Sequence, residues 1–232
     1  MTIRSIYRTA TAAILALLAL GAVASASAEA APEWFHAGQV ISHNIAFTSS
    51  GGKVKLRIVA SGSRFECTSN RSSGELEKPD REKHVIDVFT GCVGINLKKE
   101  ECTMHSVGAA KEGEIVTAPL KGELGQVAHE EATSEVGLAL EEESGGKEFA
   151  KIEGSCFGGG VSLAGRIAGE VAPTHSELTS GELVFAATES RQMIHNITLG
   201  GKKESLVMTL AGQETTMANT MKVTFGEAVE VT

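Results

Sequence analysis

Short runs of alternating apolar and polar residues, rich in β-branched side chains, recur along most of the chain. Clusters of Gly, Ser and charged residues separate these runs, as in SSGG at 49–52, ESGG at 143–146 and LGGKK at 199–203. Such runs, with turn signals between them, predict the strands of an all-β fold. The predicted strands are Arg57–Ala60, Val85–Phe89, Glu114–Thr117, Val136–Leu140, Val161–Ile167 and Leu206–Leu210.

No segment has the apolar periodicity of a long amphipathic helix. The best candidate, residues 129–143, alternates at its centre through Val136, Leu138 and Leu140, which predicts a strand there. We therefore expect an antiparallel β-sandwich or a partly open barrel, and we prefer the sandwich to a closed barrel. Because large side chains are scarce, six phenylalanines are predicted to fill the core: Phe47, Phe65, Phe89, Phe149, Phe185 and Phe225.

The N-terminus has the order of features of a secretory signal peptide. Arg4 and Arg8 precede an apolar stretch over residues 10–23, and Ala-Ser-Ala at 26–28 is a small-residue cleavage signal. The alternative is a membrane anchor, but a span needs about 20 apolar residues. We predict a signal peptide at 1–28 and a secreted all-β domain at 29–232, with a possible sub-boundary near 174–182.

Export decides how the four cysteines are interpreted. In an oxidising compartment, Cys67, Cys92, Cys102 and Cys156 predict two disulfides. No CxxC pair provides the local spacing of a zinc site or a redox pair. Three pairings are possible, and we favour Cys92–Cys102, which closes a short loop, together with Cys67–Cys156.

The charge of the chain disfavours two classes of partner. The chain has 21 Lys and Arg against 29 Asp and Glu, and two of the basic residues lie in the predicted signal peptide. Nucleic acids and anionic membrane surfaces both favour a basic face. We predict no nucleic-acid partner and no stable membrane anchor.

Catalytic motifs are missing from the sequence. There is no GxSxG segment for a nucleophilic serine. The only aspartates are Asp80 and Asp87, and Asp87 within HVIDVF is predicted to lie on the solvent face of a half-buried strand. The run Glu141–Glu143 adjoins a turn and is predicted to be a solvated loop.

Seven histidines raise the question of a zinc site: His36, His43, His84, His105, His129, His175 and His195. None is spaced as HxH or HExxH, although three could still converge in space. We predict no catalytic residue, no metal ligand and no cofactor.

One part of the chain resembles a known group of proteins. The similar features are FTGC at 89–92, a second Cys after a short loop, the hairpin GEIVTAPLKGELG at 113–125, and Cys156 after the segment FAK. Over about residues 51–174 the sequence is similar to uncharacterised secreted proteins of high-GC Gram-positive soil bacteria. The resemblance implies export, but it implies no activity, cofactor or catalytic residue.

The sequence therefore favours an exported, non-enzymatic structural or binding module at or near the bacterial cell envelope, with a possible envelope or protein partner. One alternative is a secreted hydrolase whose Glu and His residues assemble a site only in space. A second alternative is a subunit of a surface assembly. The contents of the largest concavity discriminate between them, because convergent Glu and His side chains there would favour the hydrolase.

Overall fold

The computed structural model describes residues 30–77, 79–95, 98, 100–127, 135–155 and 159–232. The predicted signal peptide lies outside the described residues. The described residues contain strands and no helix, and accordingly none of them forms a helix able to cross a membrane. The predictions of an all-β chain and of no long helix are confirmed for this part of the chain.

Twenty strands follow one another along the described chain. Their bounds are β1 Trp34–His36, β2 Gln39–Val40, β3 Ile45–Gly51, β4 Val54–Ile58, β5 Arg64–Cys67, β6 Ser69–Glu77, β7 Arg81–Thr90, β8 Val93–Ile95, β9 Glu101–Ser106, β10 Ile115–Val116, β11 Leu120–Val127, β12 Glu135–Glu142, β13 Glu148–Gly154, β14 Val161–Gly165, β15 Ile167–Ala172, β16 Leu178–Phe185, β17 Asn196–Leu199, β18 Lys202–Ser205, β19 Met208–Leu210 and β20 Gln213–Val231.

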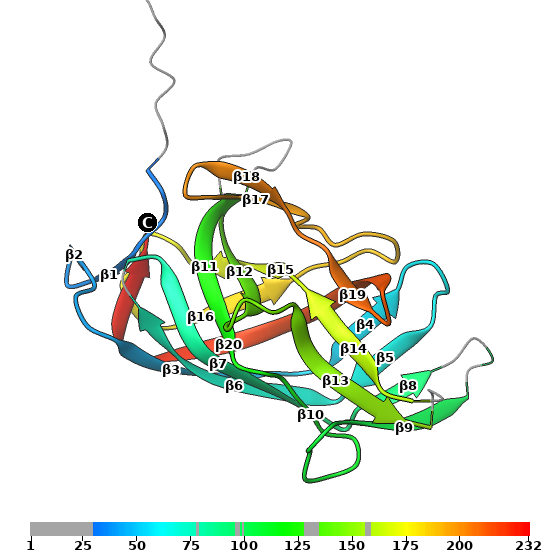
Figure 1. The fold of residues 1–232 in the computed structure, drawn as a ribbon. Helices are drawn as coiled ribbons and strands as arrows, with labels where there is room; N and C mark the ends of the chain where they lie inside the picture. The colour runs from blue at the N-terminus through cyan, green and yellow to red at the C-terminus, as the bar shows by residue number, and fades with distance from the viewer. Residues whose placement is uncertain (1–29, 78, 96–97, 99, 128–134, 156–158) are drawn as a thin grey trace, which may run out of the picture. The chain divides into compact units, whose positions relative to one another are not determined.

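Eight of these strands close into an antiparallel barrel. The pairings run β3–β6–β7–β11–β12–β15–β16–β20 and return from β20 to β3 (Figure 1). We call this ring the main barrel. The preference for a sandwich is wrong, because β20 pairs with both β3 and β16 and leaves no open edge between them. Residues 178–182, at the possible sub-boundary, belong to β16 of this barrel.

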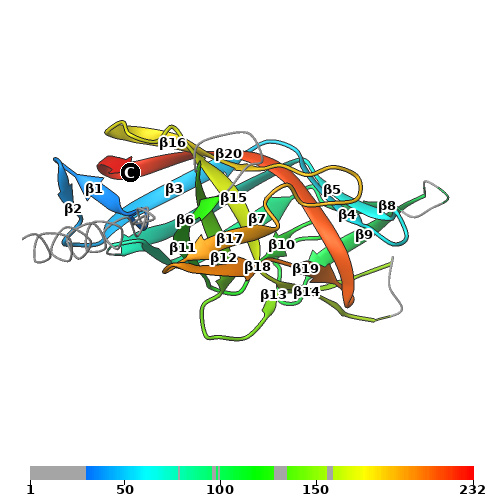
Figure 2. The same ribbon diagram turned by 90° about the horizontal axis from the view of Figure 1, so that it is seen from above.

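A second ring of strands continues the same barrel wall. The pairings β4–β5–β8–β9–β13–β14–β19 close through the first residues of β20. We call this the second ring. The 19-residue strand β20 belongs to both rings, and Figure 2 shows it running from one to the other. Strand β3 pairs with β20 at 221–225 and β4 pairs with it at 215–218, so β4 continues the wall that β3 begins.

Alternating side chains fill both rings with one hydrophobic core. Strand β3 shows the pattern, since Ile45 and Phe47 are buried and the residues between them are exposed. This period of two is what a barrel wall requires, because successive side chains point to opposite faces. Five of the predicted core phenylalanines are buried, and Phe225 is partly buried against the same core, so this prediction is confirmed.

The outer wall of the main barrel is covered on one side. The hairpin β17–β18 pairs with β11 through Thr198 and Gln126, and its apolar residues form a second cluster with Val127, Ala139 and Ala168. Small residues let the hairpin approach closely. A Cβ atom on Gly125 would lie 2.6 Å from the Thr198 carbonyl oxygen.

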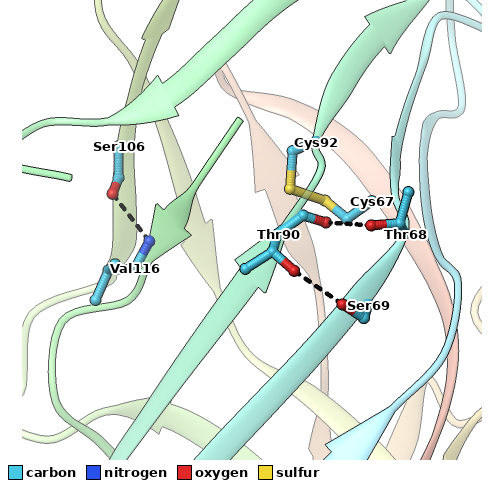
Figure 3. The surroundings of a disulfide bond; sticks show 7 residues. All are labelled: Cys67, Thr68, Ser69, Thr90, Cys92, Ser106 and Val116. Carbon is cyan, nitrogen blue, oxygen red and sulfur yellow. Dashed lines mark hydrogen bonds between the residues drawn. A yellow bond between two sulfur atoms is a disulfide. The ribbon is translucent and has the colours of Figure 1, made fainter. Parts of the chain in front are cut away.

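The disulfide pairing differs from the prediction. Cys67 is bonded to Cys92, with their Cα atoms 3.9 Å apart (Figure 3). Both favoured pairings, Cys92–Cys102 and Cys67–Cys156, are therefore wrong. The reason is strand register: Ser69 pairs with Thr90 and Glu66 pairs with Val93, so Cys67 and Cys92 face each other across the sheet between those pairs. No described cysteine is free, and Cys156 lies outside the described residues.

Candidate functional site

The main barrel encloses a cavity of about 40 Å³. Most of its lining is apolar, and Trp34 and Phe225 form part of it. A cavity of this size has room for a few water molecules. The other apolar side chains around it include Phe47, Val85, Leu138, Leu140, Met221 and Val223.

Two carboxyl groups of β7, those of Glu82 and Asp87, also line this cavity. Their exposed fractions are only 4% and 7%. The prediction that Asp87 lies on the solvent face is wrong. In HVIDVF both faces of the strand carry apolar residues, so alternation alone does not show which face is inside.

A bulge in β7 turns Glu82 inward. Val85 and Asp87 share the inner face, and an uninterrupted strand would place residue 83 rather than 82 on that face. The register with β6 shifts here, because Ser73 pairs with Ile86 whereas Glu75 pairs with Lys83. The extra residue belongs to β7, where His84 has a φ of 53°. Bulges of this kind re-aim side chains.

Asp87 belongs to a row of polar groups that crosses three strands. Ser49 of β3 pairs with Ser72 of β6, and Ser72 pairs with Asp87. The two serine hydroxyls are hydrogen-bonded at 2.5 Å, and Ser72 also hydrogen-bonds the Asp87 carboxyl. The Asp87 backbone N–H donates to the Thr117 hydroxyl. The Asp87 Oδ1 atom is buried without a hydrogen-bond partner among the described residues.

Burial changes the acidity of both carboxyl groups. Loss of hydration raises the pKa of Glu82 to about 8, and the nearby charge of Asp87 adds to that rise. Burial also raises the pKa of Asp87, to about 7, against the opposing hydrogen bond from Ser72. Near neutral pH, each of these two carboxyl groups is partly protonated, whereas an ordinary carboxyl group is fully ionised.

Two buried amides lie further along the same walls. Asn70 precedes Ser72 on β6, and Asn219 lies on β20. A Cβ atom on Gly51 would lie within 3.0 Å of an amide oxygen of each, so the two side chains converge where Gly51 has none. Both amide groups lack hydrogen-bond partners among the described residues.

Strand β1 covers one end of the main barrel. Trp34 is 2% exposed and packs edge-to-face against Phe225, with ring centroids 5.8 Å apart. Its backbone N–H donates to the Pro79 carbonyl, and the strand pairs with the end of β20. Trp34 therefore separates the cavity from this end.

The histidines do not gather at the cavity. His36 and His43 both approach the Glu227 carboxylate, at 3.4 and 3.2 Å, and these side chains are 37–51% exposed. His84 contacts Glu143 on the outside, and His129 lies outside the described residues. Among the described residues no group of three or more His, Cys, Asp or Glu side chains is placed to hold a metal ion.

The acidic run Glu141–Glu143 also lies away from the cavity. Glu141 forms ion pairs with Lys121 and Arg166, and Glu142 accepts hydrogen bonds from Ser144. These contacts hold the turn after β12 and the outer wall. Glu141 and Glu142 end strand β12, and Glu143 begins the turn. The prediction of a solvated loop is therefore wrong, and Glu142 is only 8% exposed.

A larger hollow, of about 360 Å³, lies over the charged residues around β7, β11 and β12. Its basic side chains are paired: Lys83 with Glu77, Lys121 with Glu141, and Arg166 with Glu141. This hollow therefore offers ion pairs that already satisfy one another. The main-barrel cavity, with its two buried acids, is the stronger candidate site.

Comparison with known proteins adds no identity to this geometry: no family model, curated protein or solved structure matches the chain.

Proposed function

We propose that this protein is an exported binding module that holds a small, mostly apolar molecule inside the main barrel. One observation carries the proposal: two buried carboxyl groups, Glu82 and Asp87, face a cavity whose other walls are mostly apolar. Binding sites commonly combine apolar walls with a few polar groups that fix orientation. Barrels of eight strands have interiors of a size that holds one small ligand.

The size of the cavity limits the ligand. About 40 Å³ admits only a small group, so a longer molecule requires movement at the covered end. Trp34 is the side chain to move, because it lines the cavity and belongs to the short strand β1. The ligand would replace part of the contact between Trp34 and Phe225.

Export from the cytoplasm is part of the proposal. The predicted signal peptide and the Cys67–Cys92 disulfide both support export, since disulfides persist in oxidising compartments. A place at or near the cell envelope is part of the same proposal. A binding module is favoured over a hydrolase, because the described lining of the cavity places no histidine beside the two acids.

Trp34 also provides the test, as the only tryptophan in the chain. Purified secreted protein is titrated with a panel of small apolar fragments, and tryptophan fluorescence and melting temperature are recorded. We expect at least one fragment to change the fluorescence saturably and to raise the melting temperature. The variant Trp34→Phe should lose the fluorescence signal, because it removes the only tryptophan. A panel without any saturable response would refute the proposal.

A further inference from the structure

We infer that the ligand carries a protonated amine, which binds to Glu82 and Asp87 while its apolar part lies toward Trp34 and Phe225. This inference rests on the proposed binding function and names the chemical class of the ligand. The geometry behind it is charge of one sign in a mostly apolar cavity. Among the described residues lining the cavity there are acids but no Lys, Arg or His.

The arrangement of the acids favours a cation. A buried carboxylate is costly unless a charge or several hydrogen bonds compensate it. The Ser72 hydroxyl bonds one side of Asp87, and Oδ1 remains without a partner in the described chain. An ammonium group has three N–H donors and a positive charge, so it can satisfy Oδ1 and the neighbouring Glu82 together.

Other ligand classes fit less well. An anion would be repelled by both carboxyl groups and would find no basic side chain among the described lining residues. A neutral alcohol could hydrogen-bond a carboxyl group, but it would not compensate a charge. The aromatic and aliphatic end of the cavity suits an alkyl or aryl substituent.

Binding should release protons. An ammonium ion enters with its charge, each carboxyl group that ionises gives one proton to solvent, and no covalent bond other than O–H changes. Apparent affinity should therefore rise with pH through about 7 to 8, where the two acids lose their protons. It should fall again near pH 10, where an alkylamine itself loses its proton.

Glu82 also borders the charged hollow over β7, β11 and β12, whose other charged residues are Glu77, Arg81, Lys83, Lys121, Glu123, Glu141, Glu143 and Arg166. Four of the neighbouring strands contribute non-titrating side chains to the cavity, namely Ser49 of β3, Ser72 of β6, Leu138 and Leu140 of β12, and Met221 and Val223 of β20. The remaining acid of the lining is Glu182 of β16, which is exposed.

The test compares charged and neutral ligands of equal shape. Straight-chain alkylamines from methylamine to hexylamine are titrated against the alcohols of the same lengths, by calorimetry and Trp34 fluorescence. We expect the best amine to bind at least about tenfold more tightly than its alcohol, since charge-assisted hydrogen bonds are the stronger kind. Calorimetry in buffers of different ionisation heats should show proton release at pH 7.

The matched variants are Glu82→Gln and Asp87→Asn, which keep the shape of each side chain. Each should weaken amine binding by about tenfold or more and leave alcohol binding unchanged. Glu75→Gln, on the neighbouring strand β6, is the control and should bind like the wild type, because Glu75 bonds Asn44 on the outside. Melting curves show which variants are folded.

Two failures are distinguishable. Alcohols that bind as tightly as amines, with no effect of either variant, would overturn the ammonium inference and leave the binding function standing. If neither series binds and the fragment panel is also silent, both proposals are wrong.

Discussion

The main barrel and the second ring share strand β20 but differ in what they enclose. The second ring is filled by apolar side chains, among which Met104 and Leu210 have no exposed surface. The main barrel encloses a cavity, two carboxyl groups and a row of serine hydroxyls. The disulfide lies where the two rings meet, between β5–β6 and β7–β8. Both rings contribute to one hydrophobic core, and we infer that binding belongs to the main barrel.

The largest expected effect separates the two rings with one type of substitution. Leu210→Ala in the second ring should lower the free energy of unfolding by about 4 kcal/mol, because it leaves a void in a fully packed site. Leu140→Ala beside the existing cavity should cost less, about 2 to 3 kcal/mol, since Leu140 already has open space on one side. Urea denaturation of both variants measures the difference. Equal losses would contradict the division between the rings.

Loss of the disulfide should rank next. The Cys67→Ser, Cys92→Ser double variant should lose about 3 kcal/mol, because the bond closes a loop of 25 residues in the unfolded chain. Denaturation midpoints with and without the bond measure this. A double variant as stable as the wild type would show that the strand register alone holds the junction of the rings.

The Cys67–Cys92 disulfide also predicts which cysteine bonds to Cys102. With Cys67 and Cys92 paired and no described cysteine free, Cys156 is the remaining partner for Cys102. Peptide mapping of unreduced secreted protein should yield one cross-linked peptide containing Cys102 and Cys156. A peptide with a free Cys156 thiol would contradict this pairing.

These results show which features local sequence determines. Alternation predicted the buried phenylalanines and strands that overlap the observed ones, because those depend on residues near one another in the chain. It placed some bounds wrongly: Val161–Ile167 was predicted as one strand, whereas β14 ends at Gly165 and β15 begins at Ile167. Barrel closure could not be predicted, since it depends on β20 pairing with β3, which lies some 170 residues away in the sequence. The disulfide was missed for a related reason. It depends on the register of β6 with β7, which no local motif reveals.

The candidate site was missed for two local reasons. Asp87 lies in a run with apolar residues on both faces, so its direction was undetermined by pattern. Glu82 faces inward only because of the bulge at His84, and HVIDVF contains no Gly that would indicate one. One signal for the site was present in the sequence. Asp87, one of only two aspartates in the chain, lies within the otherwise apolar run VIDVF.

The covering hairpin β17–β18 should contribute less than either ring's core. Gly125→Ala should cost about 2 kcal/mol, because the added methyl group would meet the Thr198 carbonyl oxygen and the Leu199 side chain at 2.6 Å. Hydrogen exchange should show faster opening of residues 196–205 while the second ring stays protected. The control is Gly52→Ala, whose added methyl group meets no atom within 4 Å and which should be nearly neutral. Gly200→Ala is not a suitable control, because Gly200 has a positive φ. Uniform loss of protection would show that the hairpin and barrel open together.

The last expected effect is the pH dependence that Glu82 and Asp87 give to stability. Glu82 and Asp87 have pKa values raised to about 8 and about 7 in the folded protein, above the ordinary values near 4 of an unfolded chain. The folded state therefore holds more protons than the unfolded state between about pH 4 and 8, and stability should fall as the pH rises through that range. Because each pKa unit corresponds to about 1.4 kcal/mol, we expect the fall attributable to these two groups between pH 5 and 8 to be several kcal/mol for the wild type. The Glu82→Gln, Asp87→Asn double variant cannot ionise at these positions, so its stability should change less with pH.

Denaturation midpoints of the wild type and the double variant at pH 5, 6, 7 and 8 test this, with Glu75→Gln as the control that should follow the wild type. Parallel curves for all three proteins would mean that the two carboxyl groups titrate as ordinary acids, and the main barrel would then lose the electrostatic feature that sets it apart from the second ring.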